Sequence, residues 1–380
     1  MNADQAERPL LPLRPELRGE VPYGAPQLDV PVLLNVNENP YPPSAAITED
    51  IGRSVAQAAS SMNRYPDREF LELRGALASY LARESKVSLA SEQIWAANGS
   101  NEVMLHIMQA FGGPGRTAMS FTPTYSMYAE YARDTHTTWV VGERNDDFSI
   151  DVTRAVADIE RVQPAIILLT SPNNPTGTAL ASDVLTAILE AAGRVRVDGS
   201  PAVVVVDEAY AEFRRESVPS ALELLSEYPA LAVTRTMSKA FAAAGLRLGY
   251  LAASRDFVDA LRIVRLPYHL SAITQAAALA ALRHSDELLG QVAQLRAERD
   301  RTVQWLRQRK VDGVALRVAD SDANFVYFGQ FADRHAVWQG LLDRGVLIRE
   351  VGPDGWLRVS VGTRDEMDAF FSALVEVAGV

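Results

Sequence analysis

One lysine stands where covalent and acid–base chemistry could be carried out. Lys239 follows the apolar segment at 231–234 and has the hydroxyls of Thr236 and Ser238 close to it in the sequence. A single lysine is most often a solvated surface charge, yet a lysine can also form a Schiff base with an aldehyde cofactor. Arg247 follows eight residues later. Together with the two hydroxyls, this guanidinium would suit a phosphate group.

An aspartate and a tyrosine follow a second apolar segment. Asp207 comes directly after the run AVVVV, and Tyr210 lies three residues further on. An aspartate at this place often only ends a strand or caps a helix. A buried carboxylate can also keep a pyridine nitrogen protonated, which makes the ring an electron sink, while a tyrosine hydrogen-bonds the ring hydroxyl. Because Lys239 is present, we favour this second interpretation.

Two further segments offer polar groups to a ring and to a phosphate. SPNNPTG is expected to form a turn, and we predict that Asn174, fixed by the proline after it, hydrogen-bonds a ring oxygen. Gly99, Ser100 and Asn101 follow the short strand expected for IWAA and open a helix. Their backbone N–H groups would point at an anion placed there. With Thr236, Ser238 and Arg247 they are predicted to form a phosphate-binding cup.

The elements that must position these residues are short apolar strands at 165–169, 202–206 and 231–234. Continuous apolar runs without polar alternation are typical of strands buried on both faces, as in a parallel sheet covered by helices. Ligands bind at the carboxyl ends of such strands. The segments TSPNNPTG, DEAY and RTMSKAF follow these ends, so we expect their side chains to converge.

The segments before and after these strands show other sequence patterns. A helical period starts at residue 68, and a second helix is expected from about Asn101 to Phe111. The proline-rich residues 1–45 predict an extended arm. Helices are expected at 273–282 and up to Lys310, followed by alternating strands and helices. This pattern predicts a large cofactor-binding domain at 46–268, and a smaller domain formed by 269–380 together with the arm at 1–45.

The composition and short motifs of the chain argue against several classes of function. The 380 residues are 48% apolar, enough for a sizeable core, and carry a net charge of -11, which disfavours nucleic acid and anionic membranes as partners. The absence of cysteine excludes disulfides and a cysteine nucleophile. The five histidines show no ligand spacing, so no metal is expected. FGGPGR lacks the lysine of a P-loop. Without a signal-like N-terminus or a membrane-spanning run, a cytoplasmic protein is expected.

The motifs NGSNE, PTY, SPNNPTG, DEAY, TMSKAF and GLRLGY occur in the order found in the fold type I aminotransferases, and the chain resembles this family over essentially its whole length. In detail it is similar to the histidinol-phosphate aminotransferases of actinobacterial type. The resemblance implies an α/β fold with a mostly parallel central sheet covered by helices, plus a smaller α+β domain. It also implies pyridoxal 5'-phosphate on Lys239, and transfer of an amino group from L-histidinol phosphate to 2-oxoglutarate in histidine biosynthesis.

Further residues take roles only from this resemblance. Tyr125 is similar to the aromatic residue that stacks on the cofactor ring, and Tyr65 to the tyrosine that reaches the cofactor phosphate of the neighbouring subunit, which implies a homodimer. Arg358 resembles the arginine that binds a substrate carboxylate. Arg349, Arg358 and Tyr23, helped by Asn174, resemble the residues that meet the substrate phosphate.

Small departures and alternative functions stay open. Thr236 stands where many family members have serine, which keeps the hydroxyl, and Asn101 stands where aspartate is frequent, which removes a charge. An aromatic-amino-acid aminotransferase or a decarboxylase of a phosphorylated amino acid could use the same scaffold. A non-catalytic cofactor-binding regulator would need a DNA-binding domain, for which the acidic N-terminus offers no motif.

Overall fold

A seven-stranded sheet is the largest element of the protein. A computed structural model describes residues 11–379; residues 1–10 of the predicted arm and Val380 lie outside the described part. The sheet order is β2-β8-β7-β6-β5-β3-β4. Only β8 runs antiparallel to its neighbours, so the sheet is mostly parallel, as predicted. Its strands are β2 (Ile94–Ala97), β3 (Thr117–Thr122), β4 (Thr138–Glu143), β5 (Ile166–Thr170), β6 (Val203–Asp207), β7 (Leu231–Thr236) and β8 (Gly249–Ala253).

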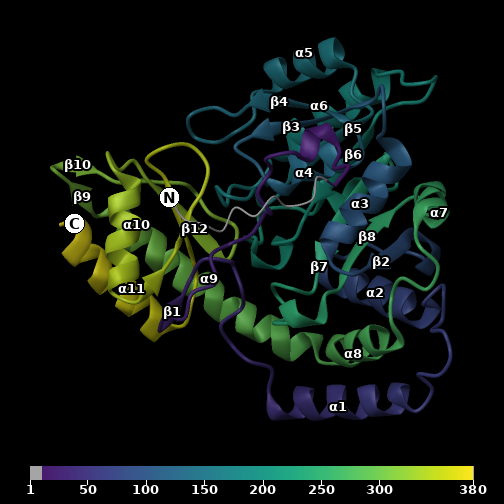
Figure 1. Ribbon diagram of the computed structural model, residues 1–380, viewed down its shortest axis with the longest axis horizontal. Helices are drawn as coiled ribbons and strands as arrows, with labels where there is room; N and C mark the ends of the chain where they lie inside the picture. Colours follow the sequence, from purple (N-terminus) through teal and green to yellow (C-terminus); the bar gives the residue numbers. More distant parts are fainter. Residues whose placement is uncertain (1–10, 380) are drawn as a thin grey trace.

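Helices surround this sheet (Figure 1). The helix predicted from residue 68 is α2, and its expected apolar face is buried. Side chains of Ser44, Asp151, Ser254 and Ser271 cap four of the helices by accepting a backbone N–H of the first turn. The helices of this part are α1 (Ala45–Ala59), α2 (Leu71–Glu84), α3 (Ser100–Phe111), α4 (Met127–Asp134), α5 (Val152–Val162), α6 (Ser182–Arg194), α7 (Arg255–Val264) and α8 (Ala272–Arg283).

A smaller α+β part lies beside the sheet and has its own antiparallel sheet, in the order β11-β12-β15-β14 (Figure 1). Two strand pairs, β1-β13 and β9-β10, flank it. The helices of this part are α9 (Ser285–Arg307), α10 (Arg334–Asp343) and α11 (Arg364–Ala378). Its strands are β9 (Lys310–Val311), β10 (Val314–Ala315), β11 (Arg317–Val318), β12 (Phe325–Gly329), β13 (Val346–Leu347), β14 (Arg349–Glu350) and β15 (Leu357–Ser360).

The long helix α9 connects two apolar cores. Leu288 and Val292 pack in the core of the large sheet, whereas Val303 and Leu306 pack in the core of the small one. Helix α8 also packs on the larger core. The domain boundary predicted near residue 269 therefore stays a prediction. Helix α8 and the first half of α9 follow that boundary in the sequence but pack on the core of the large part, so they bridge the two parts.

The N-terminal arm crosses from one part to the other, as Figure 1 shows in purple. A single turn of 3-10 helix at Pro15–Leu17 lies near α4, where Arg133 pairs with Glu20. Further on, β1 (Val32–Leu33) pairs in parallel with β13 of the small part. The described part of the arm, residues 11–45, is thus largely extended and contacts both parts, with residues 35–37 hydrogen-bonded to side chains of each part. Within residues 11–379, no helix is long and apolar enough to cross a membrane.

Candidate active site

A cavity of about 260 Å³ opens at the carboxyl ends of the parallel strands, between the two parts and the arm. Nearly all predicted site residues line it, although they come from distant stretches of the sequence. Gly99 and Tyr65 are the exceptions. The predicted residues in the wall are Tyr23, Ser100, Asn101, Tyr125, Asn174, Asp207, Tyr210, Thr236, Ser238, Lys239, Arg247, Arg349 and Arg358.

Lys239 lies in the turn after β7, where the strand leaves the sheet. Its Nζ donates to the carbonyl oxygen of Val36 at 2.9 Å and lies 5.9 Å from the centre of the Tyr210 ring. Burial lowers the pKa of the lysine to about 8, and the nearby cation of Arg358 acts in the same direction. The unprotonated fraction of this amine near neutral pH is therefore far larger than in an ordinary lysine, and this fraction can act as a nucleophile or a base.

Asp207 ends β6 and is held by three donors. Its Oδ2 accepts from the Tyr128 hydroxyl at 3.0 Å, and its Oδ1 accepts from the Thr234 hydroxyl and the Ala209 N–H, each at 3.2 Å. Burial raises the pKa of Asp207 to about 6, although these hydrogen bonds oppose the rise. A buried carboxylate with no cation paired to it favours a positively charged partner in the cavity.

One end of the cavity is built for a phosphate. Helix α3 begins at Ser100, and within the described chain no side chain caps it, so its first N–H groups are available to an anion. Arg247 Nη1 donates to Ser238 Oγ at 3.3 Å, and Thr236 Oγ1 donates to Ser238 Oγ at 3.0 Å. Gly99 lies directly behind, because a Cβ there would come within 2.6 Å of the Arg247 guanidinium. The predicted cup is thus assembled in space.

The other end carries two arginines. Arg358 is buried on β15; its Nη1 donates to Asn174 Oδ1 at 2.6 Å and its Nη2 donates to Asn35 O at 2.7 Å. Its Nε has no hydrogen-bond partner among the described residues. Arg349 lies opposite it on β14 in the strand register and donates to Gly24 O at 3.3 Å. A pair of guanidinium groups with free donors is well suited to a carboxylate or a phosphate.

The two tyrosines predicted by resemblance differ in placement. Tyr125 lies in the cavity wall, and burial raises the pKa of its phenol, so its ring is available for stacking in neutral form. Tyr65 lies outside the cavity, is 80% exposed and stacks on the ring of Tyr268 at 4.4 Å. The described chain therefore brings Tyr125, but not Tyr65, to its own site.

These residues fit pyridoxal phosphate. The uncapped helix and Arg247 would hold the phosphate, Lys239 the aldehyde carbon, and Asp207 the ring nitrogen, with Tyr210 and Asn174 near the ring oxygen. Among residues 11–379, Asp207 is paired with no cation and Arg358 Nε has no hydrogen-bond partner, so both groups could be balanced by a bound molecule. Within residues 11–379, no cluster of metal-ligating side chains offers another kind of centre.

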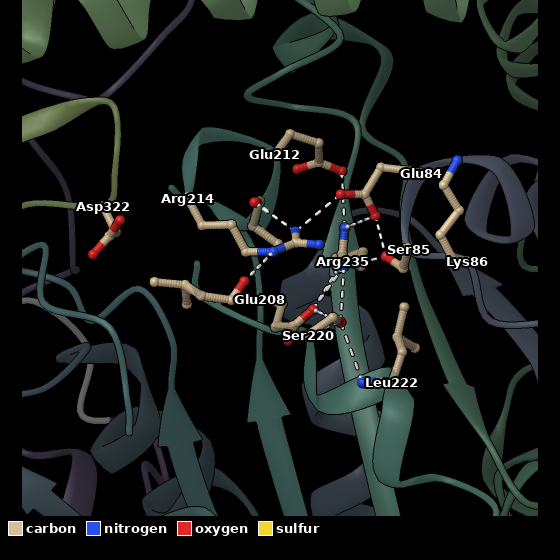
Figure 2. Close-up of polar contacts among 12 residues, drawn as sticks. Glu84, Ser85, Lys86, Glu208, Glu212, Arg214, Ser220, Leu222, Arg235 and Asp322 are labelled. Carbon is tan, nitrogen blue, oxygen red and sulfur yellow. Dashed lines mark hydrogen bonds and ion pairs between the residues drawn. The ribbon is translucent and has the colours of Figure 1, made fainter. Parts of the chain in front are cut away.

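Sequence reasoning missed a buried ion cluster behind the strand ends. Figure 2 shows Arg235 surrounded by Glu84, Glu208 and Glu212. Its guanidinium lies 2.7 Å from Glu208 and 3.2 Å from Glu212. Side chains alternate along a strand, so Arg235 and Glu208 point away from the cavity that Thr236 and Asp207 line. The strand expected at 231–234 in fact extends to Thr236. Arg235 is thus a charged residue inside a buried strand, and this was the signal in the sequence that could have indicated the cluster.

Three polar partners of the site were also missed. Tyr128 and Thr234 hold Asp207, and Asn37 donates to the Tyr210 hydroxyl at 3.0 Å. Tyr128 lies in the first turn of α4 and Tyr125 just before that helix, but nothing in the sequence indicates which tyrosine reaches the aspartate. Asn37 belongs to the arm segment NVNENPYPPS, whose prolines indicated only an extended chain.

The sequence pattern of the aminotransferase class I and II family matches residues 30–374, and the chain belongs to this family. Among named relatives, it is 59% identical to a histidinol-phosphate aminotransferase of Bifidobacterium adolescentis, over 97% of this chain and 95% of the relative. It is also 59% identical to a histidinol-phosphate aminotransferase of Thermobifida fusca, over 97% and 96%.

Solved structures agree with this family. The histidinol-phosphate aminotransferase of Sinorhizobium meliloti, determined in complex with pyridoxal-5'-phosphate, superposes with a TM-score of 0.78 at 25% identity, covering 92% of this chain and 91% of that one. An aspartate aminotransferase of Thermus thermophilus shares the fold with a TM-score of 0.75 at 22% identity, covering 95% and 99%. The fold is therefore the fold type I aminotransferase fold.

Proposed function

We propose that this chain transfers the amino group of L-histidinol phosphate to 2-oxoglutarate, giving imidazole acetol phosphate and L-glutamate, as a step of histidine biosynthesis in the cytoplasm. One observation carries the proposal. A buried arginine, whose Nε has no partner in the part of the chain that the structure describes, lines the same cavity as a lysine of lowered pKa. The chain is 53–60% identical to histidinol-phosphate aminotransferases over nearly its whole length.

Pyridoxal phosphate, when bound, supplies an aldehyde that can be joined to an amine and a ring that accepts electrons. Lys239 Nζ would hold the aldehyde carbon. When it is free, Nζ would be the base that takes the proton from the substrate carbon bearing nitrogen, and the acid that returns a proton. Its pKa of about 8 suits both steps near neutral pH.

The remaining residues orient the cofactor and stabilise its charged groups. Asp207 keeps a positive ring nitrogen in place, because a buried carboxylate without a cation gains most from such a partner. Tyr210 and Asn174 hold the ring oxygen, and Tyr125 covers the ring. The phosphate cup of Gly99, Ser100, Asn101, Thr236, Ser238 and Arg247 fixes the end far from the substrate.

One end of the cavity must accept a phosphate in one half-reaction and a carboxylate in the other. Arg358 is buried and central, so it serves both. Arg349 and Tyr23 line the same cavity and are more exposed than Arg358. They meet the larger, doubly charged phosphate of histidinol phosphate.

This division of work gives a test by substitution. A hydrogen bond to a charged group contributes about 1.5 to 3 kcal/mol, so Arg358→Ala should lower kcat/KM roughly ten- to a hundredfold for both glutamate and histidinol phosphate. Arg349→Ala should lower kcat/KM by this factor for histidinol phosphate and change it little for glutamate. Steady-state kinetics with each amino donor measures the difference. Equal losses in Arg349→Ala for the two donors would contradict the assignment of Arg349.

We further propose a homodimer in which Tyr65 reaches the cofactor phosphate of the neighbouring site. Tyr65 lies outside its own cavity, and several large apolar side chains near it are exposed. An exposed apolar patch of this kind is typical of an interface. The exposed large apolar residues are Met62 and Tyr65 after α1, Ile263 in the last turn of α7, and Leu266 and Tyr268 after that helix.

A further inference from the structure

Three consecutive residues of the N-terminal arm each contact a residue of the site. The carbonyl oxygen of Asn35 accepts from Arg358, and that of Val36 accepts from Lys239. The side chain of Asn37 donates to the Tyr210 hydroxyl at 3.0 Å. Only the third contact is made by a side chain, so it is the one that depends on residue type.

The direction of the Asn37 amide is fixed by its other partners. Its backbone N–H donates to Ser360 Oγ at 2.8 Å, and Ser360 Oγ in turn donates to Asn37 Oδ1 at 2.9 Å. Because the serine hydroxyl already accepts from the backbone, its own proton is free for this bond. The Asn37 carbonyl accepts from Asn324 Nδ2 at 3.0 Å. With Oδ1 held by Ser360, the NH₂ group must face Tyr210.

This direction determines where the proton of Tyr210 can go. The phenolic oxygen accepts from Asn37 Nδ2 at 3.0 Å and from Asn174 Nδ2 at 3.4 Å. A phenol has one proton to donate, and here both neighbouring amides present donors instead of acceptors. The Tyr210 proton is therefore left to a partner inside the cavity that Tyr210 lines. If the Asn37 amide were reversed, its Oδ1 would accept that proton, and the hydroxyl would no longer donate into the cavity.

We propose that Asn37 is a positioning residue that fixes the Tyr210 hydroxyl as a donor toward the cofactor ring oxygen. This inference rests on the proposed function, since it needs pyridoxal phosphate in the cavity. Asn37 acts only through Tyr210 and is not itself in the role of an acid or a base.

Backbone geometry and charge both favour this role. Asn37 has a φ of 57°, a left-handed conformation that asparagine and glycine adopt more readily than other residues. The charged groups near the Tyr210 hydroxyl are Arg358, Lys239 and Asp207. Replacing the neutral Asn37 leaves all three unchanged, so any effect on the site comes from the lost donor.

The test is a double-mutant cycle on the cofactor-loaded protein, with variants Asn37→Gly, Tyr210→Phe and both together. Glycine removes the amide and keeps the positive φ without strain. The readout is the pH midpoint of the visible absorbance change of the bound cofactor. A second readout is the dissociation constant of pyridoxal phosphate from the cofactor-free protein. Asn39→Gly is the matched control, because Asn39 lies in the same arm but outside the cavity.

A donor to the ring oxygen favours the deprotonated form of the loaded enzyme, in which negative charge collects there. Asn37→Gly should therefore raise the midpoint by up to roughly one pH unit and weaken cofactor binding up to about tenfold, the size of one hydrogen bond. Tyr210→Phe should raise it further, and adding Asn37→Gly to Tyr210→Phe should change nothing more.

Two results would overturn the inference while the wild-type protein keeps its visible band. One is an unchanged midpoint in Asn37→Gly. The other is a shift of the midpoint by Asn37→Gly that is as large in the Tyr210→Phe variant as in the chain that keeps Tyr210. Asn37 would then act independently of the tyrosine. A wild-type protein without any visible band would overturn the proposed function and this inference together.

Discussion

At the scale of single residues, the chemistry depends on a buried amine and a buried carboxylate. Burial moves their pKa values toward each other, to about 8 for Lys239 and about 6 for Asp207. Desolvation disfavours the charged form of each group, which lowers the value of the amine and raises that of the acid. Between these two values, most of the carboxylate is ionised, and the fraction of the amine available as a base rises with pH to about half at pH 8.

The lowered pKa of Lys239 gives a pH dependence. Only the unprotonated amine attacks an aldehyde, so the rate at which cofactor-free protein combines with pyridoxal phosphate should rise with pH and level off above about pH 8. Stopped-flow absorbance measures this rate. In Arg358→Gln the midpoint should move to higher pH, because the neighbouring cation no longer disfavours the ammonium form. A midpoint at about 10 in the unaltered chain, as in free lysine, would contradict the burial of this amine.

At the scale of elements, the ends of β6 and β7 hold the site from both sides. On the cavity side, Thr234 donates to Asp207; on the reverse side, Arg235 pairs with Glu208 (Figure 2). Strand positions and the convergence of their carboxyl ends followed from apolar runs in the sequence. The ion cluster on the reverse side could not be predicted in this way. The carboxylates around Arg235 are brought there by the packing of α2 and of the segment after β6.

Removing the central cation should destabilise the fold. Arg235 is 1% exposed and pairs with three carboxylates, so Arg235→Met should cost about 3 to 5 kcal/mol of the free energy of unfolding. Arg194, whose pair with Glu160 is exposed, is the control; Arg194→Met should cost less than about 1 kcal/mol. Urea unfolding at one fixed protein concentration measures both. Similar small losses for the two variants would show that the buried cluster is not holding the strands.

At the scale of the whole molecule, two parts and the arm meet at the site. The motif order along the chain predicted the fold class, the lysine, and the groups of the phosphate cup. The arm contacts were beyond such reasoning, because Asn37 and Tyr210 are separated by 173 positions and meet only through tertiary packing. Tyr65 illustrates the same limit, since its proposed partner lies on another chain.

A shared site can be tested with mixed subunits. Lys239→Ala should be nearly inactive, since proton-transfer catalysis is worth ~10²- to 10⁴-fold, and Tyr65→Ala should bind the cofactor weakly. If each site takes Lys239 from one chain and Tyr65 from the other, mixed dimers of the two variants regain one intact site. Statistical mixing after co-refolding should then restore up to about a quarter of wild-type activity. Activity no higher than the sum of the separate variants would contradict the dimer with shared sites.

The most direct measurement is a single-turnover titration of the cofactor-loaded protein with histidinol phosphate and, separately, with phenylalanine, following the visible absorbance of the cofactor. The predicted result is rapid loss of the band with histidinol phosphate and its return on addition of 2-oxoglutarate, with a much weaker response to phenylalanine. Equal efficiency with phenylalanine would contradict the proposed substrate and favour an aromatic-amino-acid aminotransferase. A band that does not respond to either amine would contradict transamination at Lys239 altogether.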